Sequence, residues 1–169
     1  MSGTSATQRA GLSSLARNAI IGWAFFGGII LSLVVLINVI SVIGGVVWTP
    51  FPGDFEMTEV GVAVAVFAFL PYCQMVGANV TADIFTAGAS DRALGFFSLL
   101  ASVVALGFSL LLLSRMYFGM LDQKAYNYTT AILQFPHWVA FIPILVSLAL
   151  LAVASLITLS ESVNTIRKS

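Results

Sequence analysis

Four long runs of apolar residues alternate with short polar segments along this chain of 169 residues. The runs cover residues 19–43, 55–78, 93–114 and 138–159. An α-helix rises about 1.5 Å per residue, so about 20 apolar residues cross a hydrocarbon core about 30 Å thick. Each run is therefore predicted to span a membrane as a helix. Because the connections between the runs are short, residues 1–169 are predicted to form a single transmembrane domain.

Two other interpretations of these runs are excluded. The apolar residues are continuous and do not alternate with polar ones, as they would in the strands of a membrane β-barrel. The first run is too long for the apolar part of a secretory signal peptide, and residues 42–45 lack the small-x-small pattern of a cleavage site. We therefore expect an all-α integral membrane protein of four helices that keeps its first helix.

Basic residues near the ends of the spans predict the orientation, because Lys and Arg are enriched on the cytoplasmic side. With a cytoplasmic N-terminus, the basic residues inside are Arg9, Arg17, Arg92, Arg167 and Lys168. Only Arg115 and Lys124 then lie outside, and residues 44–59 carry acids but no base. We expect both termini in the cytoplasm, with Trp48 and Trp138 marking the outer membrane boundary.

The segment before the second run contains a turn and three acidic residues. Residues 49–53 (Thr-Pro-Phe-Pro-Gly) are expected to end the first helix, and the Asp54 carboxylate is placed to cap the second. Glu56 and Glu59 follow in the first two turns, where negative charge suits the helix dipole. Two interpretations stay open, since these acids can stabilise the helix start, contact a partner, or do both.

Composition narrows the class of protein. Hydrophobic residues make up 59% of the chain and charged residues 8%, with a net charge of zero and a mean hydropathy of +1.02. These values exclude a disordered chain, a coiled coil and a basic nucleic-acid-binding protein. A single cysteine, Cys73, excludes an internal disulfide, and a single histidine, His137, excludes haem held by two histidines of this chain. We expect no catalytic or metal site.

Ionisable residues inside a membrane usually mark a functional site. The second core is counted from Val60, after the acidic helix start, and the four predicted cores then contain no charged residue. Their strongly polar side chains are Asn38 and Gln74. A proton-coupled exporter needs a buried carboxylate, and an ion channel needs a polar helix face or a carbonyl filter. The sequence therefore argues against transport by this chain alone.

Small residues recur every four positions in the first span, at Ala24, Gly28 and Ser32. Such a row lets another helix approach closely. Either it packs the four helices of this chain on each other, or it docks onto a separate membrane subunit.

The middle of the chain resembles the small membrane subunit of tripartite ATP-independent periplasmic (TRAP) transporters. The resemblance is carried by residues 52–59 (PGDFEMTE) and 72–83 (YCQMVGANVTAD), where Gly77 and Asp83 match a glycine-to-aspartate signature of that family. Residues 135–138 (FPHW), at the start of the fourth span, also resemble the family pattern. The similarity covers roughly residues 17–160.

This sequence departs from the family between those two matched positions. Ala78 and Asn79 stand where the family often has Glu and His, and Thr81 stands where it often has Arg. A role that depends on charge at these three positions is therefore not expected.

The resemblance implies a non-catalytic scaffold subunit of a bacterial inner-membrane importer. Such a subunit pairs with a large elevator-type membrane subunit that carries the substrate and sodium sites, so this chain itself is expected to bind no cofactor. A periplasmic binding protein delivers the substrate, commonly an organic acid, and the small subunit helps to dock it. The expected partners are these two proteins and the lipid bilayer, and no nucleic acid.

Ten residues are our candidates for contact with those partners. They comprise the small row of the first span, the acidic helix start and the inner connection: Ala24, Gly28, Ser32, Asp54, Glu56, Glu59, Asn79, Asp83, Asp91 and Arg92. Asp83 and Arg92 are expected to pair across the inner connection. The alternative function is a tetraspan-type adhesion or trafficking protein without a transport role.

Overall fold

The computed structural model describes residues 3–77 and 91–168, and the side chains of residues 14–77 and 99–163. Within these residues it contains four helices, namely α1 (Gly3–Val47), α2 (Asp54–Met75), α4 (Asp91–Ala125) and α5 (Trp138–Lys168). All four are long and apolar enough to cross a membrane. The predicted all-α class with four membrane helices is thereby confirmed.

Three of the four helices are longer than the apolar runs that predicted them. At its C-terminal end, α4 continues past the apolar run to Ala125 and includes Arg115, a residue expected in a loop. Apolar composition marks only the part of a helix that needs lipid, whereas backbone hydrogen bonding continues until a residue breaks it. Here the chain turns at Asn127, whose φ is 49°. In contrast, α2 ends at Met75, before the predicted end, and Gly77 follows with a φ of 68°.

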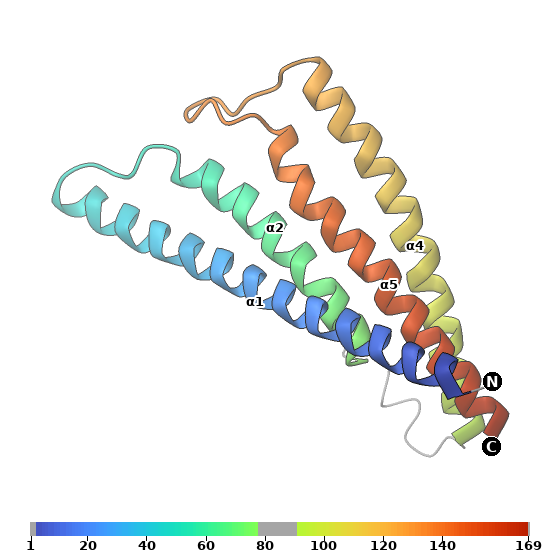
Figure 1. The fold of residues 1–169 in the computed structure, drawn as a ribbon. Coiled ribbons are helices and arrows are strands. Elements are labelled where there is room, and N and C mark those ends of the chain that lie inside the picture. Colours follow the sequence, from blue (N-terminus) through green and yellow to red (C-terminus); the bar gives the residue numbers. More distant parts are fainter. Residues whose placement is uncertain (1–2, 78–90, 169) are drawn as a thin grey trace.

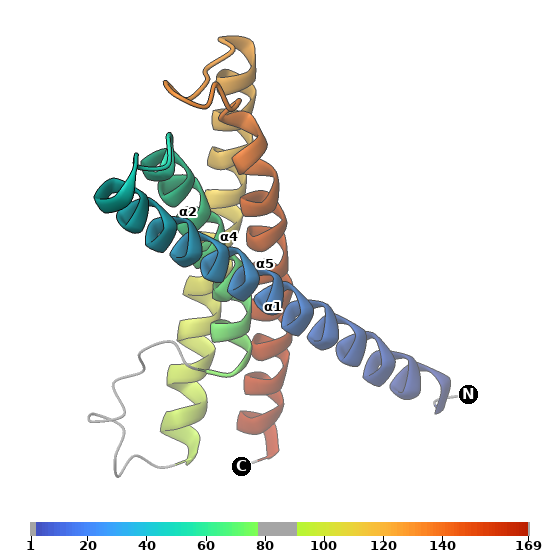
Figure 2. The ribbon, with the colours of Figure 1, turned by 90° about the vertical axis from the view of Figure 1, so that its left-hand side faces the viewer.

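The helices lie side by side in the order α1, α2, α5, α4 (Figure 1). In this view the helices diverge toward the connections α1–α2 (residues 48–53) and α4–α5 (residues 126–137), which we call the connection end. A second view shows that α1 crosses the other three helices obliquely (Figure 2). The assembly is therefore an open fan, in which α1 packs mainly on α2 and only lightly on α5.

The core is small and lies between α2, α5 and α4. It is centred on Val64, Ile144 and Leu148, against which partly buried side chains such as Phe67 and Leu112 pack. Most other large apolar side chains are exposed. In a membrane this surface is available to lipid tails or to other membrane proteins.

Two glycines allow α1 and α2 to approach closely. A Cβ atom on Gly27 would lie 2.8 Å from the Ala68 Cβ, and one on Gly61 would lie 2.3 Å from the Val34 Cγ2. Real Cβ atoms do not come this close, so any larger residue at either position would force the helices apart.

Candidate partner interfaces

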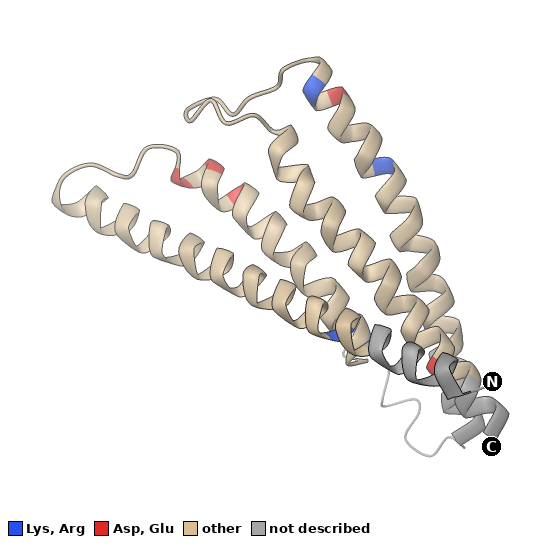
Figure 3. Cartoon of the chain, viewed as in Figure 1, with Lys and Arg blue, Asp and Glu red and all other residues tan. Residues whose placement is uncertain are grey.

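The charged side chains among the described residues gather toward the helix ends (Figure 3). Residues 18–47, 60–75, 99–114 and 138–160 carry no Asp, Glu, Lys or Arg. Within the described part of the chain, no group of three or more His, Cys, Asp or Glu residues is placed to hold a metal ion. The functional candidates in this part of the molecule are therefore contact surfaces, not buried ionisable sites.

Asp54 is not the N-cap residue of α2, so its predicted position is wrong, although its carboxylate does accept from an N–H of the first turn. The N-cap position is taken by Gly53, whose φ of 81° makes it left-handed, and Asp54 is the first helical residue. Its carboxylate accepts hydrogen bonds from the Phe55 N–H, at 2.7 Å, and from the Ser41 hydroxyl. The Ser41 oxygen also accepts from the Phe51 N–H at 3.2 Å. Asp54 therefore holds the end of α1 and its connection against the start of α2.

A second polar contact joins the same two helices one turn further along. The Asn38 side-chain amide donates to the Thr58 hydroxyl oxygen at 2.7 Å and to the Val34 carbonyl at 2.8 Å. Thr58 in turn donates to the Asp54 carbonyl at 2.7 Å. The polar residue that the sequence singled out in the first span thus serves packing between α1 and α2.

Glu56 contacts a segment that lies far away in the sequence. Its two carboxylate oxygens accept hydrogen bonds from the Ile132 and Leu133 N–H groups, at 2.7 Å and 3.0 Å. These contacts join the start of α2 to the α4–α5 connection. Glu59, one turn later, is exposed. Asp54, Glu56 and Glu59 therefore have different contacts, although the sequence analysis treated them as one acidic surface.

The α4–α5 connection has a hairpin-like backbone. Thr129 and Pro136 form an antiparallel bridge. The Thr130 N–H donates to the Phe135 carbonyl at 2.9 Å, and the Phe135 N–H donates to the Thr130 hydroxyl oxygen at 3.0 Å. Ile132, at the tip, is 61% exposed. This ordered segment exposes apolar side chains, and the sequence analysis did not identify it because none of its contacts follows from a local motif.

The two tryptophans expected at the membrane boundary both lie at the connection end. Trp48 directly follows α1 and is 88% exposed. Trp138 is the first residue of α5, and the Lys124 ammonium lies 5.3 Å from the centre of its ring, within cation–π distance. Their place at a membrane boundary stays a prediction.

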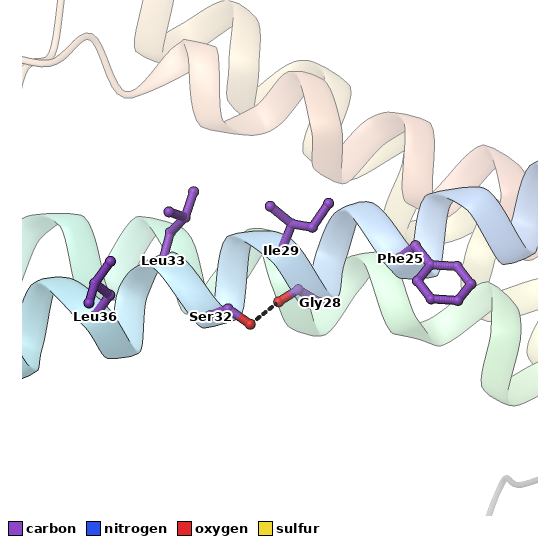
Figure 4. A pocket seen from close by; sticks show the side chains of 6 residues that line it. All are labelled: Phe25, Gly28, Ile29, Ser32, Leu33 and Leu36. Atoms are coloured by element: carbon purple, nitrogen blue, oxygen red, sulfur yellow. Dashed lines mark hydrogen bonds between the residues drawn. The ribbon is translucent and has the colours of Figure 1, made fainter.

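One side of α1 forms a shallow groove that faces away from the other helices (Figure 4). Gly28 and Ser32 lie in it, and the Ser32 hydroxyl donates to the Gly28 carbonyl at 2.9 Å. A Cβ atom on Gly28 would meet nothing within 4 Å. The small row therefore does not pack the helices of this chain on each other at Gly28, and that interpretation is wrong there. The close approach is made instead by Gly27 and Gly61.

A polar cluster joins three helices near the other end of the fan. The Gln74 amide on α2 and the Ser102 hydroxyl on α4 both donate to the Thr158 hydroxyl oxygen on α5, each at 3.2 Å. Thr158 itself lies within donor distance of the carbonyls of the preceding turn. The second polar residue singled out in the sequence thus also serves helix packing.

The inner connection lies largely outside the described residues. Asn79 and Asp83 fall in the segment that the structure does not describe, and Asp91 and Arg92 lie in α4 but without described side chains. The Asp83–Arg92 pair therefore stays a prediction.

Comparison with known proteins gives one match. The model of the family described as tripartite ATP-independent periplasmic transporters, DctQ component, matches residues 31–165, from the middle of α1 almost to the end of α5. Searches of curated proteins and of solved structures gave no match.

Proposed function

This chain belongs to the DctQ components of the tripartite ATP-independent periplasmic transporters, and we propose that it is the non-catalytic scaffold subunit of a sodium-coupled importer of an organic acid. The observation that carries this proposal is the family match over residues 31–165. The same match favours a transporter subunit over the tetraspan alternative.

The distribution of charge supports a division of labour between subunits. An organic acid and sodium ions need buried polar or charged groups, and the described apolar segments of this chain carry no charge. We therefore assign the substrate and sodium sites to the large elevator-type membrane subunit. This chain would then bind no cofactor of its own.

The groove side of α1 is the surface we assign to the large subunit. Phe25 is 71% exposed and Ile29 is 60% exposed, whereas Gly28 between them leaves the backbone accessible. Large side chains beside a glycine suit the close packing of a second membrane helix. Because α1 packs on this chain mainly through α2, its opposite side is available for a partner.

The connection end is the surface we assign to the periplasmic binding protein. We propose that both termini lie in the cytoplasm, and four spans would then put the α1–α2 and α4–α5 connections on the periplasmic side of a bacterial inner membrane. The acidic helix start and the exposed apolar tip of the α4–α5 connection lie together there, because Glu56 binds that connection.

Reconstitution tests this proposal directly. The chain is co-expressed with the large membrane subunit proposed as its partner, and the complex is placed in proteoliposomes with the proposed periplasmic binding protein outside. We expect organic-acid uptake that requires an inward sodium gradient, the binding protein and this chain. Potassium in place of sodium is the control for the gradient. Uptake of equal rate when this chain is omitted would overturn the proposal.

A further inference from the structure

The tip of the α4–α5 connection holds a carboxylate with two successive backbone N–H groups. Ile132 and Leu133 both donate to Glu56, and Gln134 follows with a φ of 54°. Successive N–H groups that point to one side form a concave site for an anion. In this chain the anion is the Glu56 carboxylate on α2, so the conformation of the connection depends on a side chain from another element.

A packing contact reinforces the same junction. A Cβ atom on Gly53 would lie 2.5 Å from the Leu133 Cγ, so the Leu133 side chain occupies the space that any other residue at position 53 would fill. The φ of 81° at Gly53 also favours glycine. The start of α2 therefore fixes the tip of the α4–α5 connection in two ways. Glu56 binds the backbone of the tip, and Gly53 leaves room for the Leu133 side chain.

Ile132, whose backbone amide binds Glu56, has an exposed side chain. The Ile132 side chain is 61% exposed, whereas its N–H donates to Glu56. Both carboxylate oxygens of Glu56 are occupied within the chain, which leaves the connection itself as the surface that meets a partner.

We infer that Glu56 is a positioning residue, which acts through the Ile132 and Leu133 amides to hold the α4–α5 connection in the conformation that docks the periplasmic binding protein. This inference rests on the proposed function, which places docking at the connection end. It assigns Glu56 an indirect role, because its carboxylate shapes the docking surface and does not touch the partner.

The expected effect follows from the population of the docking conformation. Apparent affinity falls in proportion to the fraction of molecules that are competent to bind. If loss of the carboxylate lowers that fraction to about one tenth, the half-saturating concentration of the binding protein rises about tenfold. The maximal uptake rate stays unchanged, because the large subunit carries out transport once docking has occurred.

The test compares Glu56→Gln with Asp122→Asn in the reconstituted complex. Both variants remove one carboxylate from the connection end, since Asp122 is an exposed residue in the last turn of α4. Amide hydrogen exchange of residues 130–135 reports the conformation of the connection without the binding protein. Sodium-driven uptake at increasing concentrations of the binding protein then separates half-saturation from maximal rate.

We expect Glu56→Gln to speed exchange in residues 130–135 and to raise half-saturation alone, and Asp122→Asn to change neither. Gly53→Ala, which displaces Leu133 from the same junction, is expected to act like Glu56→Gln and serves as the second variant. Unchanged exchange in both variants, or faster exchange with unchanged half-saturation, would overturn the inference. A wild-type complex that transports without the binding protein would instead overturn the proposed function.

Discussion

The Trp23 indole on α1 donates a hydrogen bond of 2.8 Å to the Ser147 hydroxyl on α5, joining two helices that otherwise touch little. Ser147 is buried and in turn donates to the Pro143 carbonyl at 2.8 Å. The two ends of α1 are thus held differently. Near the connection end α1 is bound to α2 through Asn38 and Ser41, and in its first half it is bound to α5 through Trp23.

Trp23→Phe and Ser147→Ala should each destabilise the fold, because each removes one partner of this bond. Hydrogen bonds between membrane helices contribute about 0.6 kcal/mol on average and up to about 1.7 kcal/mol. We expect the double variant to lose less stability than the sum of the two single variants, by an amount in this range. Thermal unfolding in mild detergent measures all three. Ser160→Ala, which removes only a local bond to the Ile157 carbonyl on α5, is the control. Additive losses would show that the bond contributes nothing to stability.

Thr158→Val should weaken the junction of α2, α4 and α5. Valine keeps the shape of threonine but removes the oxygen to which both Gln74 and Ser102 donate. A loss of about 1–2 kcal/mol in the free energy of unfolding is expected, since two interhelical bonds are affected. Ser114→Ala removes a bond within α4 alone and should cost less. A Thr158→Val variant as stable as Ser114→Ala would contradict a packing role for this cluster.

The number of helices could be predicted because membrane spans are specified by length and local composition, as in residues 19–43. Their ends could not, because α4 continues to Ala125 where no lipid requires apolar residues. The sequence also marked Asn38 and Gln74 as unusual, since polar side chains within an apolar run need partners. Those partners, Thr58 and Thr158, depend on how the helices pack and leave no local signal.

The contact of Glu56 shows why the candidate surface was predicted only in part. An acidic helix start could be recognised from the order of Gly53, Asp54 and Glu56, but the groups that Glu56 binds are backbone amides. Every residue except proline has such an amide, so the residue types at positions 132 and 133 do not predict the contact. The sequence also left open which side of α1 packs within the chain, because Gly27 and Gly28 are adjacent and only their place around the helix distinguishes them.

Fusion reporters should place both termini in the cytoplasm. Green fluorescent protein fused after Ser169 should fluoresce, whereas alkaline phosphatase inserted after Ile132 should be active, because the phosphatase folds only in the periplasm. The expectation follows from the excess of basic residues on the terminal side and the acids Asp54, Glu56 and Glu59 on the other. An active phosphatase fused after Ser169 would contradict this orientation and with it the assignment of the docking surface.

Gly27 and Gly28 should respond in opposite ways to a larger side chain. Gly27→Ala places a Cβ atom 2.8 Å from the Ala68 Cβ, and overpacking of this kind costs about 1–3 kcal/mol. The helices of the isolated chain should therefore unfold at a lower temperature. The Cβ atom of Gly28→Leu meets nothing within 4 Å, so thermal unfolding of the isolated chain should stay unchanged, while the leucine blocks close approach of a helix from outside.

Co-purification tests whether Gly28 lies at the interface with the large subunit, which thermal unfolding of the isolated chain does not report. Gly28→Leu should lower the yield of the large subunit recovered with the tagged chain at least several-fold. Gly107→Leu is the matched control, because Gly107 on α4 is also a helical glycine with nothing within 4 Å of its added Cβ. If both leucine variants recover the large subunit equally well, the groove side of α1 is not the subunit interface. If Gly107→Leu alone loses the large subunit, the interface lies on α4 instead.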